Sequence, residues 1–235
     1  MCSLKLKDIR EECLEANLQL PQTGLVDLTF GNVSVLDKDA GIFAIKPSGV
    51  PYGDLKAADM VLVDLEGNIV DSKLKPSSDT PTHRCLYIAF SGDGVRSVVH
   101  THSRCAVAFA QAGKGIPCLG TTHADHFYGT VPVTRAMTAE EIQGEYEWET
   151  GNVIVETFKE TKPLDIPAVL VRGHGPFAWN VSGAKAVEYA EALEISADMA
   201  LKTFSLVPDC PPLQQVLLDK HFLRKHGAGA YYGQG

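Results

Sequence analysis

The sequence predicts an α/β protein that folds as one large domain. Segments with strand-like spacing alternate with segments of helical spacing along 235 residues, which is the pattern of a mixed fold. The chain is 45% hydrophobic and 21% charged, so a domain of this length can bury a substantial core without disulfides. We therefore expect a single domain covering residues 1–235. The segments alone do not define the order or direction of the strands.

The predicted helices follow from apolar periodicity and from the residues at their ends. Residues 3–20 carry apolar side chains at helical spacing, and Pro21 follows the expected end of this helix. A second helix is expected at 79–90, with Asp79 or Thr80 as its cap. The remaining predicted helices cover residues 103–113, 183–205 and 211–226.

Short apolar runs bounded by turn residues predict the strands. These runs are residues 41–46, 60–65, 68–71, 95–102 and 166–173. The run at 95–102 is the most informative of them, because its hydrophobic residues lead directly into two histidines.

Composition and motifs argue against several classes of protein. The net charge of −8 gives no indication of a nucleic-acid surface, and no apolar run approaches the ~20 residues that span a bilayer. Six cysteines without CxxC spacing are typical of reduced thiols, and the charged N-terminus lacks an apolar signal-peptide core, so we expect a cytoplasmic protein. A P-loop GK[ST] pattern and a complete GxGxxG fingerprint are absent, so no nucleotide cofactor is expected.

Histidines at 100, 102 and 174 form the strongest candidate for a metal site. Alternate side chains of a strand share one face, so His100 and His102 can converge on one ion at the end of a hydrophobic run. His174 lies between two glycines after another predicted strand, where the backbone can turn sharply. Three histidines and a carboxylate suit Zn²⁺ or a similar divalent ion. The alternative is that His100 and His102 are a buried and a hydrogen-bonded histidine with structural roles.

Three loops combine small residues, hydroxyl groups and exposed backbone N–H groups. They are FGNVS at 30–34, IKPSG at 45–49 and PSSD at 76–79. Ser77 and Ser78 directly precede the predicted helix at 79–90, whose N-terminus favours negative charge, and Lys46 adds a full positive charge. Any one of these loops is compatible with an ordinary turn, but the three together favour a phosphate-binding pocket.

Assembled in order, these segments resemble the class II aldolase/adducin family nearly from end to end. The motifs are GNVS, IKPSGV, KPSSDTPTH, VVHTHS, GTTHADHFYGT, GEYEWETGNVIVET, HGPFAW and the C-terminal AYYGQ. HTH with a later HGPF is shared across the family, whereas SSDTPTH, TTHAD and AYYGQ are typical of its epimerases.

The resemblance implies a three-layer α/β/α fold in which helices cover a central, largely antiparallel sheet. It also implies a homotetramer with active sites between neighbouring subunits, in which the C-terminal tail (about 211–235) completes a neighbour's site. An epimerase of this family is a divalent-metal-dependent isomerase of carbohydrate metabolism. It inverts C4 of a phosphorylated pentulose by cleaving and re-forming the C3–C4 bond.

The matching motifs also imply roles for individual residues. The three histidines would bind the metal, Zn²⁺ or another divalent ion such as Mn²⁺, with Asp79 at or beside it. Asp125 and Tyr232 would be the acid/base pair, with Tyr232 reaching in from an adjacent subunit, and Arg224 is a further candidate for substrate handling beside His221. The residues that would bind the substrate and its phosphate are Gly31, Asn32, Lys46, Ser48, Gly49, Ser77, Ser78 and His221. The remaining histidines, expected to be structural, are His83, His123, His126 and His226.

Two alternatives remain open for the function. A class II sugar-phosphate aldolase of the fuculose or rhamnulose phosphate type would release the two fragments, and in those aldolases a Glu commonly stands where this chain has Asp79. A non-catalytic relative of the adducin kind should lose its metal ligands, and all three histidines remain here. The Asp at this position and the AYYGQ tail favour the epimerase.

Overall fold

The centre of the molecule is one seven-stranded sheet. The structure, a computed structural model, describes residues 2–227 and 230–231. The strand order in these residues is β4-β3-β2-β1-β5-β7-β6, and every pair of neighbouring strands is antiparallel. The strands are β1 (Asn32–Asp37), β2 (Ile42–Ile45), β3 (Val61–Asp64), β4 (Ile69–Asp71), β5 (Ser97–His100), β6 (Ala168–Leu170) and β7 (Pro176–Asn180).

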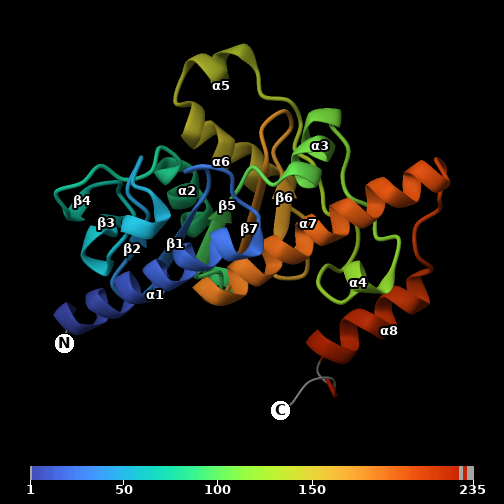
Figure 1. Cartoon of the computed structure of the whole chain (residues 1–235), viewed down its shortest axis with the longest axis horizontal. Helices are drawn as coiled ribbons and strands as arrows, with labels where there is room; N and C mark the ends of the chain where they lie inside the picture. Colours follow the sequence, from blue (N-terminus) through green and yellow to red (C-terminus); the bar gives the residue numbers. More distant parts are fainter. Residues whose placement is uncertain (1, 228–229, 232–235) are drawn as a thin grey trace.

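Helices cover both faces of this sheet (Figure 1). α1, α3 and α7 pack on one face and α2 and α6 on the other, and each face has its own hydrophobic core. The helices are α1 (Cys2–Thr23), α2 (Thr80–Phe90), α3 (Arg104–Ala112), α4 (Thr121–Ala124), α5 (Ala139–Gln143), α6 (Tyr146–Thr157), α7 (Gly183–Leu206) and α8 (Gln215–His226), with 3-10 turns at Tyr52–Asp54, Ala57–Asp59 and Ser91–Asp93. The predicted three-layer α/β/α fold with an antiparallel sheet is confirmed.

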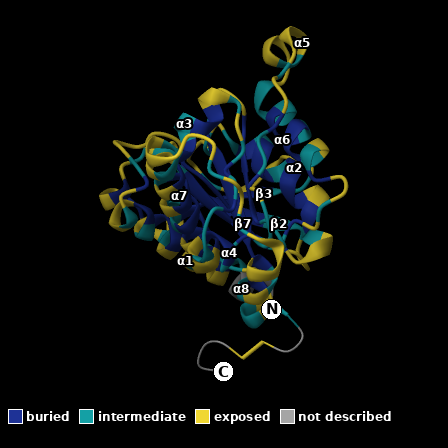
Figure 2. Cartoon of the chain, turned by 90° about the vertical axis from the view of Figure 1, so that its right-hand side faces the viewer, coloured by how far each residue is buried: buried dark blue, intermediate teal, exposed yellow. Residues whose placement is uncertain are grey.

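Burial follows the layers. Figure 2 shows the strands buried between the helices, while α5 projects from the body with a largely exposed surface. Within the described residues, none of the helices combines the length and apolar character needed to cross a lipid bilayer.

The first helix is longer than predicted. α1 continues through Pro21 to Thr23, although proline lacks an N–H donor and crowds the carbonyl four residues earlier. The break is tolerated because it falls in the last turn, where few backbone bonds remain to be lost. The Gln22 side chain donates to the Leu18 carbonyl at 3.2 Å, and Thr23 Oγ1 donates to the Leu20 carbonyl at 2.7 Å. Side chains thus satisfy carbonyls at this helix end.

The central strand β1 was not predicted, because Gly31, Asn32 and Ser34 make its segment look like a loop. A buried side chain of α1 compensates for the polar sequence. Asn17 Nδ2 donates to the Val33 carbonyl at 3.0 Å, and Asn17 Oδ1 accepts the Val33 N–H at 2.9 Å. The Asn17 amide therefore acts as a strand partner for this backbone and holds the start of β1 in place.

Two further elements, β7 and α6, were also missed, and one predicted helix begins late. β7 starts at a proline, which is unfavourable inside most strands. α6 contains Gly151 and a run of β-branched residues, both poor helix formers. Gly151 is explained by packing: a Cβ built there would lie 2.5 Å from the Cβ of Cys85 in α2. α8 begins at Gln215 rather than 211, because two prolines precede it.

Candidate metal centre and substrate cavity

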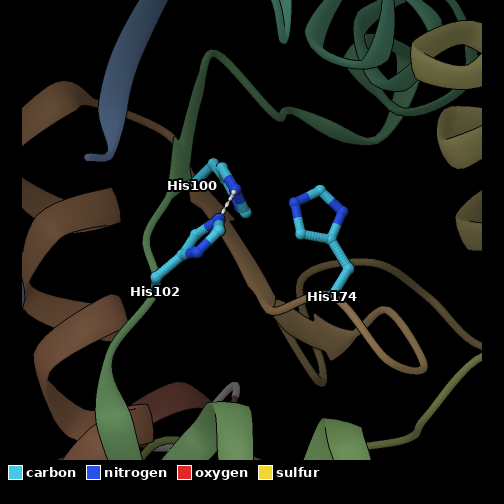
Figure 3. A group of neighbouring side chains, drawn as sticks. All are labelled: His100, His102 and His174. Carbon is cyan, nitrogen blue, oxygen red and sulfur yellow. Dashed lines mark hydrogen bonds between the residues drawn. The ribbon is translucent and has the colours of Figure 1, made fainter.

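Three histidines converge at one end of the central sheet. His100 ends β5 and His102 follows two residues later, while His174 lies in the turn between β6 and β7. β5 and β7 are antiparallel neighbours, with His100 opposite Phe177, so the end of one strand meets the start of the other. One ring nitrogen of each histidine lies within 4.8 Å of the others (Figure 3).

A backbone hydrogen bond orients the His100 imidazole as a metal ligand. His100 Nδ1 lies 2.9 Å from the Pro176 carbonyl, which only accepts, so Nδ1 carries the proton and Nε2 presents its lone pair. This Nε2 is 3.1 Å from Nε2 of His102. Two nitrogens bound tetrahedrally to one zinc ion at ordinary bond lengths are about 3.3 Å apart. The residues present therefore fit a divalent cation.

Burial keeps two of the three rings in the neutral form that binds a metal. His100 is only 2% exposed, and burial lowers its pKa to about 3 although the Asp79 carboxylate opposes the shift. The pKa of His174 is also lowered, by burial first and then by His102. Near neutral pH these two rings carry no charge and offer lone pairs to a cation.

Asp79 lies beside this group rather than within it. Its carboxylate accepts a hydrogen bond of 2.6 Å from Asn32 Nδ2 and contacts Ser77 Oγ at 3.5 Å. Burial acts to raise its pKa, but the imidazoles of His100 and His83 and the Asn32 donor hold the pKa below its ordinary value. Asp79 is not one of the residues whose ligand atoms lie within 4.8 Å of one another. Direct binding of the metal by Asp79 stays a prediction.

One cavity of about 470 Å³ contains the three histidines and all three predicted phosphate loops. Two of the loops pair with each other: Ser48 N–H donates to the Lys75 carbonyl and Ser77 N–H to the Lys46 carbonyl, both at 3.0 Å. Gly31 is needed for close approach, because a Cβ there would lie 3.0 Å from the His100 carbonyl oxygen. The predicted site residues in the cavity wall are Gly31, Asn32, Lys46, Ser48, Gly49, Ser77, Ser78, Asp79, His100, His102 and His174.

Lys46 supplies a positive charge to this cavity. Its side chain is 3% exposed, and its Nζ lies 4.9 Å from the centre of the Tyr52 ring. Burial lowers its pKa. Among the described residues it forms no ion pair with a carboxylate, so its charge is available to an anion in the cavity. Lysine in such a setting is a common phosphate ligand.

Asp125 and His221 lie together in a second cluster, between α4 and α8. Asp125 Oδ1 is 2.9 Å from His221 Nδ1 and 3.0 Å from Arg224 Nη2, and Asp125 Oδ2 is 3.4 Å from Lys225 Nζ. Burial acts to raise the pKa of Asp125, but His221, Arg224 and Lys225 hold it below its ordinary value. This acid–base cluster shares no residue with the cavity of the same chain.

A model of the class II aldolase and adducin N-terminal domain matches residues 11–201. The chain belongs to the class II aldolase and adducin family. It is 49% identical over 229 residues to proteins named L-ribulose-5-phosphate 4-epimerase UlaF from Salmonella paratyphi A and Salmonella typhi, covering 97% of this chain and 100% of each relative. A solved structure named L-fuculose 1-phosphate aldolase has a TM-score of 0.76 at 23% identity, covering 91% of this chain and 94% of that one. The corresponding aldolase of Thermus thermophilus has a TM-score of 0.67 at 27% identity, covering 86% and 97%.

The structure adds cavity residues to which sequence reasoning assigned no role. Tyr146 and Glu147, in the first turn of α6, line the cavity together with Thr29, Phe30 and Pro47. The sequence signal for Tyr146 and Glu147 is the family motif GEYEWET. Their position in the cavity does not follow from this motif alone, because local propensity does not predict that α6 is a helix directed at the histidines.

The remaining predicted residues fall into two groups. Tyr232 lies outside the described residues, so its role stays a prediction. The four histidines expected to be structural each bind a nearby group of the protein. Their partners are Ser34 for His83, the Gly129 carbonyl for His123, the Thr122 carbonyl for His126 and the Asp125 carbonyl for His226.

Proposed function

We propose that this chain is an L-ribulose-5-phosphate 4-epimerase, which interconverts L-ribulose 5-phosphate and D-xylulose 5-phosphate. In this proposal a divalent ion, Zn²⁺ or another such as Mn²⁺, is held by His100, His102 and His174. The observation that carries the proposal is the convergence of these imidazoles with Lys46 and the serine loops in one cavity. The nearly full-length likeness to proteins named as this epimerase supports it. The expected cytoplasmic location belongs to the same proposal.

The reaction itself calls for such a site. In a 2-ketose, C4 is not adjacent to the C2 carbonyl, so its C–H bond is not acidified and direct proton removal is unfavourable. Cleavage of the C3–C4 bond avoids this step. The C4 hydroxyl loses its proton, the bond electrons pass to the C2 carbonyl oxygen, and an enediolate and glycolaldehyde phosphate result. Rotation of the aldehyde and re-formation of the bond invert C4 without loss of atoms.

Each group in the cavity has a part in this scheme. A bound divalent ion supplies Lewis-acid stabilisation of the negative charge that develops on the sugar oxygens. Lys46, with the hydroxyl groups of Ser48, Ser77 and Ser78, binds the phosphate. Because the phosphate stays bound, the aldehyde fragment is kept close to the enediolate until the bond re-forms. Asp79 remains ionised beside the imidazoles and adds negative charge that favours a cation.

The proton transfers are assigned to Asp125 and Tyr232. Asp125 is ionised near neutral pH because of its cationic neighbours, so it serves as the base, and Tyr232 serves as the acid. Asp125 and His221 lie outside the cavity of their own chain. We therefore propose a homotetramer in which the α4–α8 cluster and the tail, about 211–235, complete a neighbouring subunit's site.

Product analysis tests the activity. Purified protein loaded with Zn²⁺ or Mn²⁺ is expected to convert L-ribulose 5-phosphate to D-xylulose 5-phosphate. Asp125→Asn and Tyr232→Phe should stay folded and keep the metal while each loses about 10²–10⁴-fold in rate. Loaded wild-type protein that forms no D-xylulose 5-phosphate would refute the epimerase.

Subunit mixing tests the shared site. His100→Asn and Asp125→Asn chains, each inactive alone, are co-expressed with different tags and purified as mixed assemblies. If a site takes His100 from one chain and Asp125 from the next, random assembly leaves about one quarter of the sites intact. If both residues act within one chain, no site is intact and the mixture stays inactive.

A further inference from the structure

Tyr146 contacts the metal candidate His174 on the side away from the other two histidines. Its hydroxyl oxygen lies 3.3 Å from His174 Nδ1, and the two rings are stacked, with centroids 6.2 Å apart and planes 27° apart. In Figure 3 the other nitrogen of His174 faces His100 and His102. The tyrosine therefore contacts the ring nitrogen that is not directed at the proposed ion.

Binding of the proposed ion would fix which nitrogen of His174 carries the proton. A neutral imidazole binds a cation through the unprotonated nitrogen, so the inward nitrogen of His174 must be bare and Nδ1 must be protonated. A protonated Nδ1 needs an acceptor. The Pro176 carbonyl fills this role for His100, and the Tyr146 oxygen is placed to fill it for His174.

The tyrosine is held firmly enough to orient a partner. Thr82 Oγ1 in α2 donates to the Glu147 carbonyl, and Thr150 Oγ1 donates to the Tyr146 carbonyl at 2.8 Å. Gly151 lets α6 approach α2 so closely that a Cβ would meet Cys85 at 2.5 Å. The first turn of α6 is therefore fixed to the helix that begins beside Asp79. A hydroxyl mounted on such a rigid element can set the orientation of a ring.

We propose that Tyr146 is a positioning residue for the metal centre, which accepts the Nδ1 proton of His174 and so directs the bare nitrogen of that ring toward the ion. The inference rests on the proposed metal site. It gives a chemical role to the tyrosine of the GEYEWET motif.

Metal affinity of the whole, metal-free protein provides the test. Zn²⁺ is titrated against a chromogenic chelator, and the visible spectrum of the Co²⁺-substituted protein reports the ligand geometry. Tyr146→Phe keeps the ring and loses only the hydroxyl, and it is expected to weaken Zn²⁺ binding about 10-fold to 100-fold and to change the Co²⁺ spectrum. Tyr189→Phe, which removes a tyrosine hydroxyl from α7 outside the cavity, is the matched control and should bind like wild type.

The outcomes separate this inference from the proposed function. Equal Zn²⁺ affinity and identical Co²⁺ spectra for wild type and Tyr146→Phe would overturn the role of Tyr146 and leave the metal-dependent epimerase standing. Wild-type protein that binds no stoichiometric metal would overturn both. A selective loss in Tyr146→Phe, with circular dichroism unchanged and Tyr189→Phe normal, would support the positioning role.

Discussion

Gly151→Ala has two opposing effects on stability: alanine favours the helix, but its Cβ clashes with a neighbouring helix. The structure indicates that the clash is the larger effect. Gly151 lies inside α6 with no positive φ, so on local grounds alanine should stabilise the helix by about 1 kcal/mol. The alanine Cβ, however, would lie 2.5 Å from the Cβ and 2.8 Å from the Sγ of Cys85. The clashing carbon is attached directly to the α2 backbone and has no rotamer by which to move away.

The size of the effect follows from this distance. Carbon atoms in contact are about 3.5–4.0 Å apart, so α2 and α6 must separate by about 1 Å locally. Overpacking of this kind costs about 1–3 kcal/mol, and the upper end applies because a Cβ cannot rotate out of the way. After the gain in helix propensity, we expect a net loss of about 2 kcal/mol in the free energy of unfolding. This corresponds to a fall of about 4–8 °C in the midpoint of thermal unfolding.

The displacement should also reach the cavity. Tyr146 and Glu147 lie in the same helix, one turn or so before Gly151, and both line the cavity. A misplacement of about 1 Å can reduce activity by about 10²-fold. Gly151→Ala is therefore expected to weaken metal binding and turnover as well as stability.

Urea denaturation at a fixed protein concentration measures the loss. Gly92→Ala is the matched control, because a Cβ at Gly92 meets nothing within 4 Å. It should be neutral or stabilise by about 0.4–1 kcal/mol. Adding Cys85→Gly to Gly151→Ala removes the opposing Cβ and should recover part of the loss. If Gly151→Ala is as stable as Gly92→Ala, the account of the α2–α6 contact is wrong.

Three further predictions concern the cavity and the α4–α8 cluster. His100→Asn should abolish stoichiometric metal, measured by elemental analysis, because it removes one of the three converging imidazoles. Ser77→Ala should raise KM for the phosphorylated substrate more than it lowers kcat, since the serine is proposed to bind phosphate in ground and transition states alike. Burial acts to raise the pKa of Asp125, but His221, Arg224 and Lys225 together outweigh burial, so the folded-state pKa lies below that of an unfolded aspartate. The cluster therefore stabilises the fold above the ordinary pKa of an aspartate and loses this effect as pH falls through the lowered pKa, so urea unfolding of wild type and Asp125→Asn should converge in acid.

Elements with a strong local pattern were the ones that the sequence predicted well. The helix expected at 183–205 is α7, Gly183–Leu206, and the strands expected at 41–46 and 60–65 contain β2 and β3. Their apolar residues recur at one clear period, so the amino-acid sequence itself shows which residues face the core. Turn residues on either side mark their ends.

The missed elements depend on partners that are distant in the sequence. β1 pairs with β2 and β5, and Asn17, 16 residues before Val33, satisfies the backbone at its start. α6 accommodates Gly151 because Cys85 of α2 occupies the space that a side chain would fill. Neither contact can be inferred from local propensity, since both are made only after the layers have assembled.

The same distinction applies to the site. The sequence singles out the three histidines and the serine loops, which lie together in one cavity, because their residue types and positions at segment ends are informative by themselves. The separation of the Asp125 cluster from the cavity was not visible, because it depends on α8 docking against α4 rather than against the sheet. Tyr146 was missed for a related reason, since its role depends on the placement of a helix that was not predicted.

Asp79→Glu addresses what distinguishes an epimerase from an aldolase on this fold. The Asp79 carboxylate is held by Asn32 at 2.6 Å and lies outside the group of converging imidazoles, so we expect it to balance charge rather than to exchange protons with a substrate carbon. Glutamate is longer by one methylene and extends the carboxylate by about 1.5 Å toward the cavity. A carboxyl group within reach of the enediolate carbon, once it has taken up the proton released by the C4 hydroxyl, would protonate that fragment and prevent the bond from re-forming. We therefore expect Asp79→Glu to release more dihydroxyacetone and glycolaldehyde phosphate per D-xylulose 5-phosphate formed, measured by trapping both fragments enzymatically during turnover. A release ratio equal to that of the wild type, with metal still bound, would mean that the length of this side chain does not control the fate of the fragments.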